Sequence, residues 1–311
     1  MTQQRMLPIG ITDDQPRSMY GADWTLGDQK PKVVVSWGGG VQSTTLSELC
    51  ISRDPRLLEV TAGVLPDVFL FSDVGDEPAA VYAHIAKMRP RIEAAGFEFR
   101  IVTKGEVLSE HVIERATSGR KNISMPPMYV KREKTPGNMP VRRSCTFDFK
   151  ARVLDKAAKS FFGIRRVTKK WVRENDPVSH WIGISTDETR RAKWSVDPWR
   201  IFWHPLLEMG FSRTDCTDFL KSRGIVAPRS ACVYCPFHSD AEWRRVKAVP
   251  ADWAATIAFE KGVHAAWDAT GTIAGLRTKP YLHKSRQPIE LVAFDGSDEN
   301  EDEECSGNCG L

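Results

Sequence analysis

Two cysteines separated by two residues are the pattern with the clearest chemistry in this sequence. Cys232 and Cys235 place two thiolates within reach of one metal ion or one cluster. The chain has seven cysteines, and in a reducing compartment such spacing indicates metal or redox chemistry rather than a disulfide framework. Three alternatives follow. They are an iron–sulfur cluster with Cys145 as third ligand, a zinc site in which His238 completes a Cys3His set, and a purely structural or dithiol pair.

A run of three glycines, Gly38, Gly39 and Gly40, is the second chemical feature. Apolar residues predict a buried strand from Lys32 to Ser36 before it, and a helix beginning near Ser43 after it. Glycines at such a junction let backbone N–H groups and a helix N-terminus approach phosphate oxygens. The run lacks the lysine of a Walker A loop and the spacing of a dinucleotide fingerprint. It predicts an anion site, with a purely structural glycine turn as the alternative.

A third group of thiols lies near the end of the chain, at Cys305 and Cys309. Small residues surround them and an acidic segment precedes them, so we expect thiols that can swing into a site and exchange with sulfur there. The acidic segment before these cysteines should raise their pKa values and slow nucleophilic attack by their thiols. The alternative is a tail with incidental cysteines. By contrast, Cys50 and Cys216 have apolar neighbours on predicted helices and are expected in the core.

The net charge of +4 hides an asymmetry along the chain. Residues 295–311 hold seven acidic side chains and no Lys or Arg, so the charge of residues 1–294 alone is +11. Residues 117–143 hold seven basic residues, four prolines and no periodicity, which predicts a basic loop. A basic body suits a polyanion such as a phosphorylated nucleotide or a nucleic acid, although an ordinary solvated surface is the alternative.

The elements that must position these residues alternate between strand and helix. Apolar or alternating segments predict further strands, and capping patterns at Ser212 and Ser239 predict helix starts. The order predicts an α/β fold, a mostly parallel sheet with helices on both faces, followed by a cysteine-bearing C-terminal helical region. The expected strands are 68–72, 97–103, 180–184 and 201–204, and the expected helices are 77–95, 146–162 and 212–223.

Four ordered segments resemble the phosphoadenosine phosphosulfate (PAPS) reductase family of the PP-loop superfamily. The usual loop of that family is Ser-Gly-Gly-x-Asp-Ser, and Gly38 and Gln42 here replace its first Ser and its Asp. The other three segments are similar to its second-strand Asp-x-Gly element, its Gly…Glu…Arg element and its Pro-Leu element. They are Phe71-Ser72-Asp73-Val74-Gly75, Trp181 to Arg191, and His204-Pro205-Leu206-Leu207.

The resemblance implies a Rossmann-like nucleotide domain over residues 31–225, with ATP or PAPS as its nucleotide. The flanking parts would be an N-terminal extension (1–30), a helical region with the CxxC pair (226–294) and an acidic tail (295–311). The implied nucleotide-binding residues are Ser36, Gly38, Gly39, Gly40, Gln42, Ser43, Asp73, Gly183, Glu188, Arg190 and Arg191.

The resemblance also bears on the cysteines. Some relatives hold a 4Fe-4S cluster with a Cys pair and a CxxC. Ser144 replaces one member of the first pair here and leaves Cys145, Cys232 and Cys235, as in three-cysteine thiolation enzymes. Zinc with His238 remains the alternative. Cys309 resembles the nucleophilic cysteine of PAPS reductases, with Asn308 in place of a Glu.

Three functions are therefore expected in order of preference. The first is adenylation with pyrophosphate release and sulfur insertion into a nucleic acid, DNA or tRNA, with a cysteine desulfurase as sulfur donor. In this first function the sulfur that displaces AMP would come from the cluster or from Cys305 or Cys309. The second is reduction of PAPS or adenylyl sulfate, in which Cys309 attacks the sulfur and a thioredoxin-like partner resolves the product. The third is a non-catalytic protein that binds nucleotide or nucleic acid. The sequence lacks the apolar run of a membrane span or a secretory signal, which favours a cytoplasmic location.

Overall fold

The computed structural model describes residues 31–131 and 144–296. The N-terminal extension, residues 132–143 of the basic loop, and the tail from residue 297 with Cys305 and Cys309 lie outside the described residues. No helix among the residues that are described is long and apolar enough to cross a membrane.

A five-stranded parallel sheet forms the centre of the first part of the structure, in the order β3-β2-β1-β5-β6. The predicted α/β fold with a parallel sheet is confirmed. The strands are β1 (Val33–Ser36), β2 (Val68–Asp73), β3 (Glu98–Thr103), β5 (Val178–Ile182) and β6 (Arg200–Trp203).

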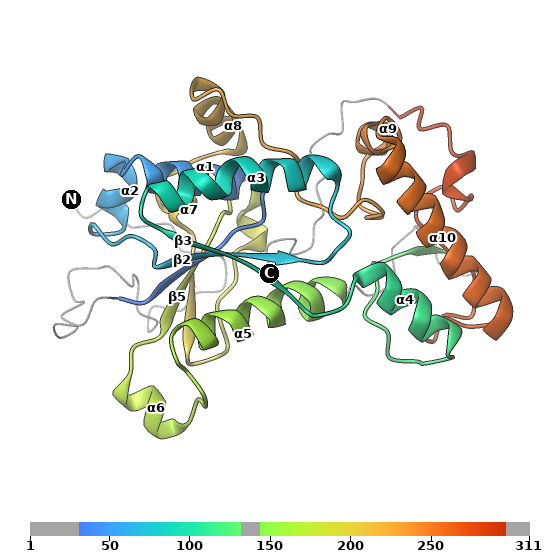
Figure 1. The fold of residues 1–311 in the computed structure, drawn as a ribbon, viewed down its shortest axis with the longest axis horizontal. Helices are drawn as coiled ribbons and strands as arrows, with labels where there is room; N and C mark the ends of the chain where they lie inside the picture. The colour runs from blue at the N-terminus through green and yellow to red at the C-terminus, as the bar shows by residue number, and fades with distance from the viewer. Residues whose placement is uncertain (1–30, 132–143, 297–311) are drawn as a thin grey trace.

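Helices cover both faces of the sheet, as Figure 1 shows with α1, α3 and α8 on one side and α5 on the other. Because side chains alternate along a strand, Val33 and Val35 of β1 join the core under α1 and α3, whereas Val34 joins the core under α5. The covering elements are α1 (Val41–Ile51), α2 (Pro55–Val60), α3 (Ala79–Ala94), α5 (Arg152–Phe161), α6 (Lys169–Glu174), α7 (Pro205–Glu208) and α8 (Arg213–Ser222).

A second hydrophobic core lies at one end of the sheet, where α4, α9 and α10 gather in Figure 1. It joins Leu108 and Val112 of α4 to Phe259 and Val263 of α10, so residues far apart in the chain share it. The elements of this part are α4 (Leu108–Thr117), β4 (Tyr129–Val130), α9 (Asp240–Lys247), α10 (Pro250–Thr270), β7 (Pro280–Tyr281) and the 3-10 turn η3 (Ile289–Leu291).

The predicted helix starts at Ser212 and Ser239 are confirmed, because each hydroxyl accepts a hydrogen bond from the backbone N–H three residues later. The predicted helix at 146–162 is present, but its first six residues form a π-helix, η1 (Thr146–Ala151). One expectation is wrong in part. The basic loop was expected to be without regular structure, yet Tyr129 and Val130 pair antiparallel with Tyr281 and Pro280, because this short strand closes over the second core.

The order of the strands places a switch point between β1 and β5. The chain runs from β1 outward to β2 and β3, then returns to the other side of β1 at β5. Connections leave in opposite directions there, so a crevice opens beyond the carboxyl ends of these two strands, the usual ligand position in a sheet of this kind. The three glycines follow β1 and Gly183 follows β5, so two of the segments picked from the sequence meet at this crevice.

The stability of this sheet is expected to depend on pH through His180 in β5. Its side chain is fully buried against Trp199 and Phe202, and burial, aided by the charge of Arg200, lowers its pKa to about 3. In the unfolded chain the His180 ring binds a proton below about pH 6.5, whereas in the folded chain it stays neutral at that pH. The contribution of the neutral ring is therefore complete above that pH and is lost as the pH falls towards 3, by about 1.4 kcal/mol per pH unit.

We expect His180→Phe to remove the part of the pH dependence of stability that comes from protonation of His180 in the unfolded chain. Urea unfolding of both proteins at pH 7 and pH 5.5 measures it, and the variant should gain about 1.4 kcal/mol relative to the wild type on going to the lower pH. An unchanged difference between the two proteins at both pH values would show that His180 is protonated in the fold.

Candidate active site

The glycine run forms the turn that leads from β1 into α1. Gly39 has a φ of +77°, in the left-handed region that favours glycine, and a Cβ there would lie 3.4 Å from the ring of Trp37. Gly40 is the N-cap of α1, and no side chain caps the helix. The N–H groups of the first turn are therefore available to an anion, as the sequence predicts.

The end of β5 touches this turn more closely than any side chain would allow. A Cβ on Gly183 would lie 2.8 Å from the backbone N of Ser43 and 2.9 Å from the carbonyl carbon of Gln42. Contacts this short against backbone atoms have no way to relax without separating the two segments. Glycine at 183 therefore allows β5 to hold the start of α1 in place, a packing role that accompanies its predicted place at the nucleotide.

Gln42 is fixed by the segment that follows β5. Its amide Nε2 donates to Oε2 of Glu188 at 3.1 Å and to Oγ of Ser185 at 3.4 Å. Glu188 in turn forms an ion pair with Arg191, within the 3-10 turn η2 (Thr186–Arg191). The structure thus brings together Gln42, Glu188 and Arg191, three of the residues that the sequence assigned to nucleotide binding.

A cavity of about 80 Å³ lies between these segments, lined by the glycine turn, Gly183 and Arg191. Two polar atoms facing this region have no hydrogen-bond partner among the described residues, Oγ of Ser36 and Nε of Arg191, although both are buried. Buried polar groups are normally paired, so these two atoms indicate room for a polar ligand. Ser36, Gln42 and Ser43 also line the cavity, in agreement with the sequence.

Two further arginines line the same cavity and were not selected from the sequence. Arg213 begins α8, and Arg229 precedes the CxxC pair, with its Nη2 donating to the carbonyl of Phe237 at 3.1 Å. Arg213 lies within the capping pattern of α8, which does not itself predict a phosphate contact, and Arg229 lies just before the CxxC pair. Only the packing of α8 and the CxxC segment against the glycine turn brings both arginines to the cavity. With Arg191 they give the cavity three cations, which suits a phosphate or sulfate.

Four predicted nucleotide-binding residues do not line this cavity, namely Gly39, Asp73, Glu188 and Arg190. Gly39 lies within the glycine turn, and Glu188 contacts Gln42 and Arg191, which do line it. Asp73 accepts hydrogen bonds from N of Gly75 at 2.7 Å and from the hydroxyl of Tyr82 at 2.9 Å, so it organises the turn after β2. Arg190 is exposed and is not among the lining residues.

The CxxC segment lies against the glycine turn. The hydroxyl of Ser230 donates to the carbonyl of Gly38, and a Cβ on Gly40 would lie 3.2 Å from Cβ of Ser230. This contact spans more than 190 residues of sequence, and it brings the CxxC segment to the edge of the cavity at the glycine turn.

The three cysteines proposed as ligands surround one small cavity. Cys145, Cys232 and Cys235 all line a space of about 30 Å³, which Lys150 also lines. Ser230, Ala231 and Cys235 line both this cavity and the one at the glycine turn. The cavity of the three thiols and the cavity at the glycine turn are therefore neighbours that share one wall.

The turn after β2 holds the CxxC segment in position. N of Val233 donates to the carbonyl of Asp76 at 2.9 Å, and the hydroxyl of Tyr234 donates to the Asp76 carboxylate at 2.5 Å. From α10, the hydroxyl of Thr256 donates to the carbonyl of Val233 at 3.2 Å, and the rings of Tyr234 and Phe259 stack at 3.9 Å. These contacts leave the two cysteine side chains on the cavity side.

The electrostatic environment keeps the thiol of Cys232 protonated in the absence of a ligand. The pKa of Cys232 is raised well above its usual value by its hydrogen bond with Cys235, by burial and by the nearby charge that Cys235 or Cys145 would carry. Glu77 adds to this effect, and its buried carboxylate pairs with Lys150 at 2.9 Å. A bound metal would reverse this preference, since coordination deprotonates a thiol.

His238 lies outside the thiol cavity. Its Nε2 is 3.0 Å from the carbonyl oxygen of Cys232, and its ring packs edge-on against Trp243. Burial lowers its pKa to about 3, so the ring is neutral. In this arrangement its Nε2 is used by the backbone rather than directed at the three thiols.

The fit of a metal or cluster is partial. The three thiols converge, and thiolates are the ligands that zinc and iron–sulfur clusters take. However, no group of three or more His, Cys, Asp or Glu side chains within 31–131 and 144–296 is arranged to hold a metal ion. A space of about 30 Å³ has room for about two water-sized atoms, so a four-iron cluster would require Cys145 and the CxxC segment to move apart.

The remaining cysteines fall into two groups. Cys50 and Cys216 are fully buried in the core under α1, as predicted, and burial raises the pKa of Cys216 to about 12. Cys305 and Cys309, the predicted catalytic thiols, lie outside the described residues.

No protein-family model matches the chain, and no curated protein matches its sequence.

The close approach at Gly183 predicts a large cost for a single methyl group. We expect Gly183→Ala to lower the free energy of unfolding by about 3 kcal/mol, because overpacking against backbone cannot relax. Urea unfolding followed by tryptophan fluorescence measures this.

Gly105→Ala is the control for that substitution. Gly105 has a φ of +91° but nothing within 4 Å of its Cβ position, so this variant should cost only the backbone strain, about 1 kcal/mol. Equal costs for the two variants would contradict the packing role of Gly183.

Proposed function

We propose that this chain is an adenine-nucleotide-dependent enzyme that performs sulfur chemistry on a nucleic acid. The observation that carries the proposal is the wall shared by the cavity at the glycine turn and the cavity of Cys145, Cys232 and Cys235. If a nucleotide activates a substrate and sulfur is then delivered to it, the nucleotide site and the sulfur site must lie side by side. We assign an adenine nucleotide to the cavity at the glycine turn because this turn resembles a PP-loop.

In the reaction we propose, a substrate oxygen attacks the α-phosphorus of ATP. An oxygen–phosphorus bond forms, the bond to the β-phosphate oxygen breaks, and pyrophosphate leaves. A sulfur nucleophile then attacks the activated carbon, and AMP leaves with the oxygen. Both steps develop negative charge on phosphate oxygens, which preorganised cations and N–H groups stabilise.

The residues of the cavity have distinct roles under this proposal. The N–H groups at the start of α1 and the side chains of Arg191, Arg213 and Arg229 bind phosphate oxygens. Glu188 holds both Gln42 and Arg191, and therefore orients two contacts to the nucleotide. Ser36 supplies a hydroxyl with no other described partner.

Cys145, Cys232 and Cys235 are the residues that would hold an iron–sulfur cluster, or zinc in the alternative. A three-cysteine cluster would supply an iron site able to carry sulfide. Until such a group binds, the raised pKa of Cys232 keeps its thiol neutral, and the hydrogen bonds of Tyr234 and Thr256 hold the CxxC segment in place.

One observation supports reduction of PAPS or adenylyl sulfate as a second candidate. Position 42 presents an amide rather than a carboxylate, and that amide is bound to Glu188, so it offers no anionic ligand to the magnesium that accompanies ATP. In that reaction Cys309 would attack the sulfur, and a thioredoxin-like partner would resolve the product.

A paired assay separates the candidates. Protein purified anaerobically is incubated with ATP, with and without DNA or tRNA, while pyrophosphate release is measured, and with PAPS while sulfite release is measured. The proposal expects pyrophosphate release that depends on nucleic acid. Sulfite without pyrophosphate would replace it with the reductase, and neither product would leave a non-catalytic binding protein.

Arg191 and its neighbour in sequence offer a matched test of the nucleotide site. Arg191→Ala removes a cation from the cavity and leaves Glu188 unneutralised beside the phosphates, so we expect affinity for ATP or PAPS to fall by about 10- to 100-fold in calorimetry. Arg190→Ala removes an exposed cation that does not line the cavity and should change affinity by less than about twofold. Equal effects of the two would mean that the nucleotide binds elsewhere.

The thiol cavity is tested by metal content. We expect anaerobically purified protein to contain iron and inorganic sulfide and to show the visible absorption of an iron–sulfur cluster. We expect Cys145→Ser or Cys232→Ser to lose most of the iron and sulfide. Cys216→Ser alters a core thiol away from this cavity and should retain the metal. Zinc without sulfide would favour the alternative, and wild-type protein without either metal would contradict both.

A further inference from the structure

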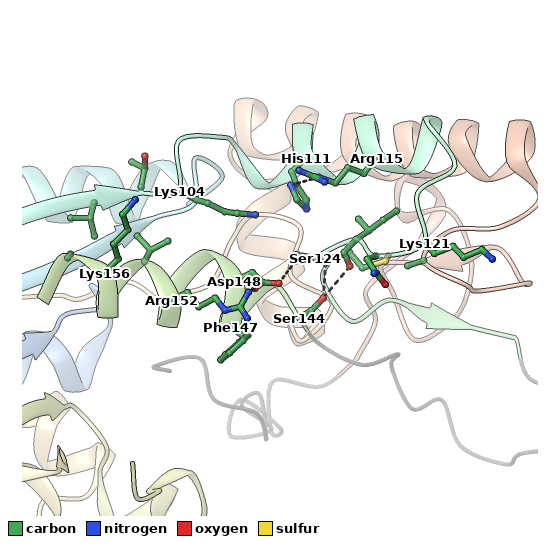
Figure 2. Close-up of a pocket in the computed structure, with 18 of the residues that line it drawn as sticks. Lys104, His111, Arg115, Lys121, Ser124, Ser144, Phe147, Asp148, Arg152 and Lys156 are labelled. Atoms are coloured by element: carbon green, nitrogen blue, oxygen red, sulfur yellow. Dashed lines mark hydrogen bonds and ion pairs between the residues drawn. The ribbon is translucent and has the colours of Figure 1, made fainter. Parts of the chain in front are cut away.

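A much larger cavity lies on the other side of η1 from the thiols. It occupies about 1120 Å³, beyond the range of about 300–1,000 Å³ typical of small-molecule pockets. Figure 2 shows His111 and Arg115 of α4 facing it from one side, and Arg152 and Lys156 of α5 facing it from the other. Its size and its two walls are those of a groove for an extended ligand.

The groove is strongly basic. Among the described residues, five cations and one carboxylate, Asp148, line it. Lys104 and Arg115 share the nearby Glu106 at 2.9 and 3.9 Å, and Arg152 pairs with Asp148 at 2.7 Å. Five cations less these two carboxylates leave three positive charges. The cations are Lys104, Arg115, Lys121, Arg152 and Lys156.

Two of these cations are available to a ligand. Lys121 and Lys156 are exposed, and neither makes an ion pair with another described residue. They lie toward opposite ends of the groove in Figure 2, with Arg152 between them. Cations spaced along a groove fit a chain of phosphates better than they fit a single compact anion.

An exposed aromatic ring adjoins the cations. Phe147 is 56% exposed, a large value for a phenylalanine, and its ring lies 4.5 Å from the guanidinium of Arg152. Exposed aromatic rings beside basic side chains are the elements on which proteins stack unpaired bases. A base paired in a duplex is stacked inside the helix and cannot offer its face in this way.

The π-helix η1 links the groove to the thiols. Phe147 and Asp148 line the groove, whereas Thr146 and Lys150 of the same turn line the thiol cavity. Ser144 belongs to the groove and its neighbour Cys145 to the thiol cavity. A ligand in the groove therefore lies one turn of helix from the thiols.

We propose that this groove binds single-stranded nucleic acid, with phosphates at Lys121 and Lys156 and an unpaired base stacked on Phe147. The inference rests on the proposed function, for which it supplies the substrate class and the surface that presents it. Asp148 stays bound to Ser124 and Arg152, so its charge does not oppose the phosphates.

Fluorescence anisotropy with labelled oligothymidylate, oligouridylate and a DNA duplex tests the groove without any turnover. The wild type should bind the single strands more tightly than the duplex. Phe147→Ala should weaken single-strand binding by about 5- to 150-fold, and Phe147→Trp should restore it. The double variant Lys121→Ala with Lys156→Ala should reduce the slope of log affinity against log salt by about 1.4.

The matched control changes two exposed lysines elsewhere. Lys169→Ala with Lys170→Ala alters α6, which buries none of its residues and lies far from α4 in Figure 1, and it should leave affinity and salt slope near wild type. Circular dichroism checks that each variant folds, which the exposure of these side chains favours. The proposal that the groove binds single strands is wrong if the α6 variant weakens binding as much as the groove variants or if Phe147→Ala has no effect. It is also wrong if polyglutamate competes as well as unlabelled oligonucleotide.

Failure of the groove and failure of the proposed function give different results. Calorimetry with ATP and PAPS on the same preparations measures nucleotide binding at the cavity of Arg191, independently of the groove. Intact nucleotide binding with no specific single-strand binding overturns the groove only. Single-strand binding at the groove in a protein that binds neither nucleotide overturns the proposed function and leaves the groove in place.

Discussion

The contact between the end of β5 and the first turn of α1 is the constraint on which the site depends. Gly183 brings two backbone segments to a separation at which even a methyl group would collide with N of Ser43. That contact fixes the start of α1 beside the segment of Glu188 and Arg191. The amide of Gln42 and the Glu188–Arg191 pair then occupy one network instead of separate surfaces. A looser junction would leave the N–H groups of the turn and the arginines without a common focus.

The second core extends this arrangement to the thiols. Because α4 packs against α10, the turn after β2 is held between them, and Asp76 in that turn binds both Ser109 of α4 and Tyr234 of the CxxC segment. The same segment reaches back through Ser230 to the carbonyl of Gly38. The result is a continuous series of contacts from the glycine turn to Cys235, built from residues that are each rigidly placed. Preorganisation of this kind is what a site needs when two reactive groups must meet in fixed geometry.

The π-helix η1 divides the region into two chemical environments. On one side are the three thiols, with the pKa of Cys232 raised, next to the paired Glu77 and Lys150. On the other side is an open groove with a surplus of cations and an exposed ring. π-helical turns occur often at functional sites, because the extra residue per turn shifts side chains out of the regular register. Here it separates Cys145 and Thr146 from Phe147 and Asp148 over a few residues.

The sequence by itself determined the parallel α/β fold, the glycine turn, the helix starts at Ser212 and Ser239, and the burial of Cys50 and Cys216. These follow from local signals, namely apolar periodicity, glycine conformational freedom and side-chain capping, each confined to a few neighbouring residues. It also selected Gln42, Arg191 and the three cysteines, which line two adjoining cavities, and Glu188, which binds Gln42 and Arg191. Only the tertiary structure decided that Asp73 organises a turn, that Arg190 does not line the cavity, and that Arg213 and Arg229 do. The pairing of Tyr129 with Tyr281 and the basic groove were equally hidden, since they arise from contacts between segments far apart in the chain. Local patterns specify what a segment can form, but which segments meet depends on how the whole core packs.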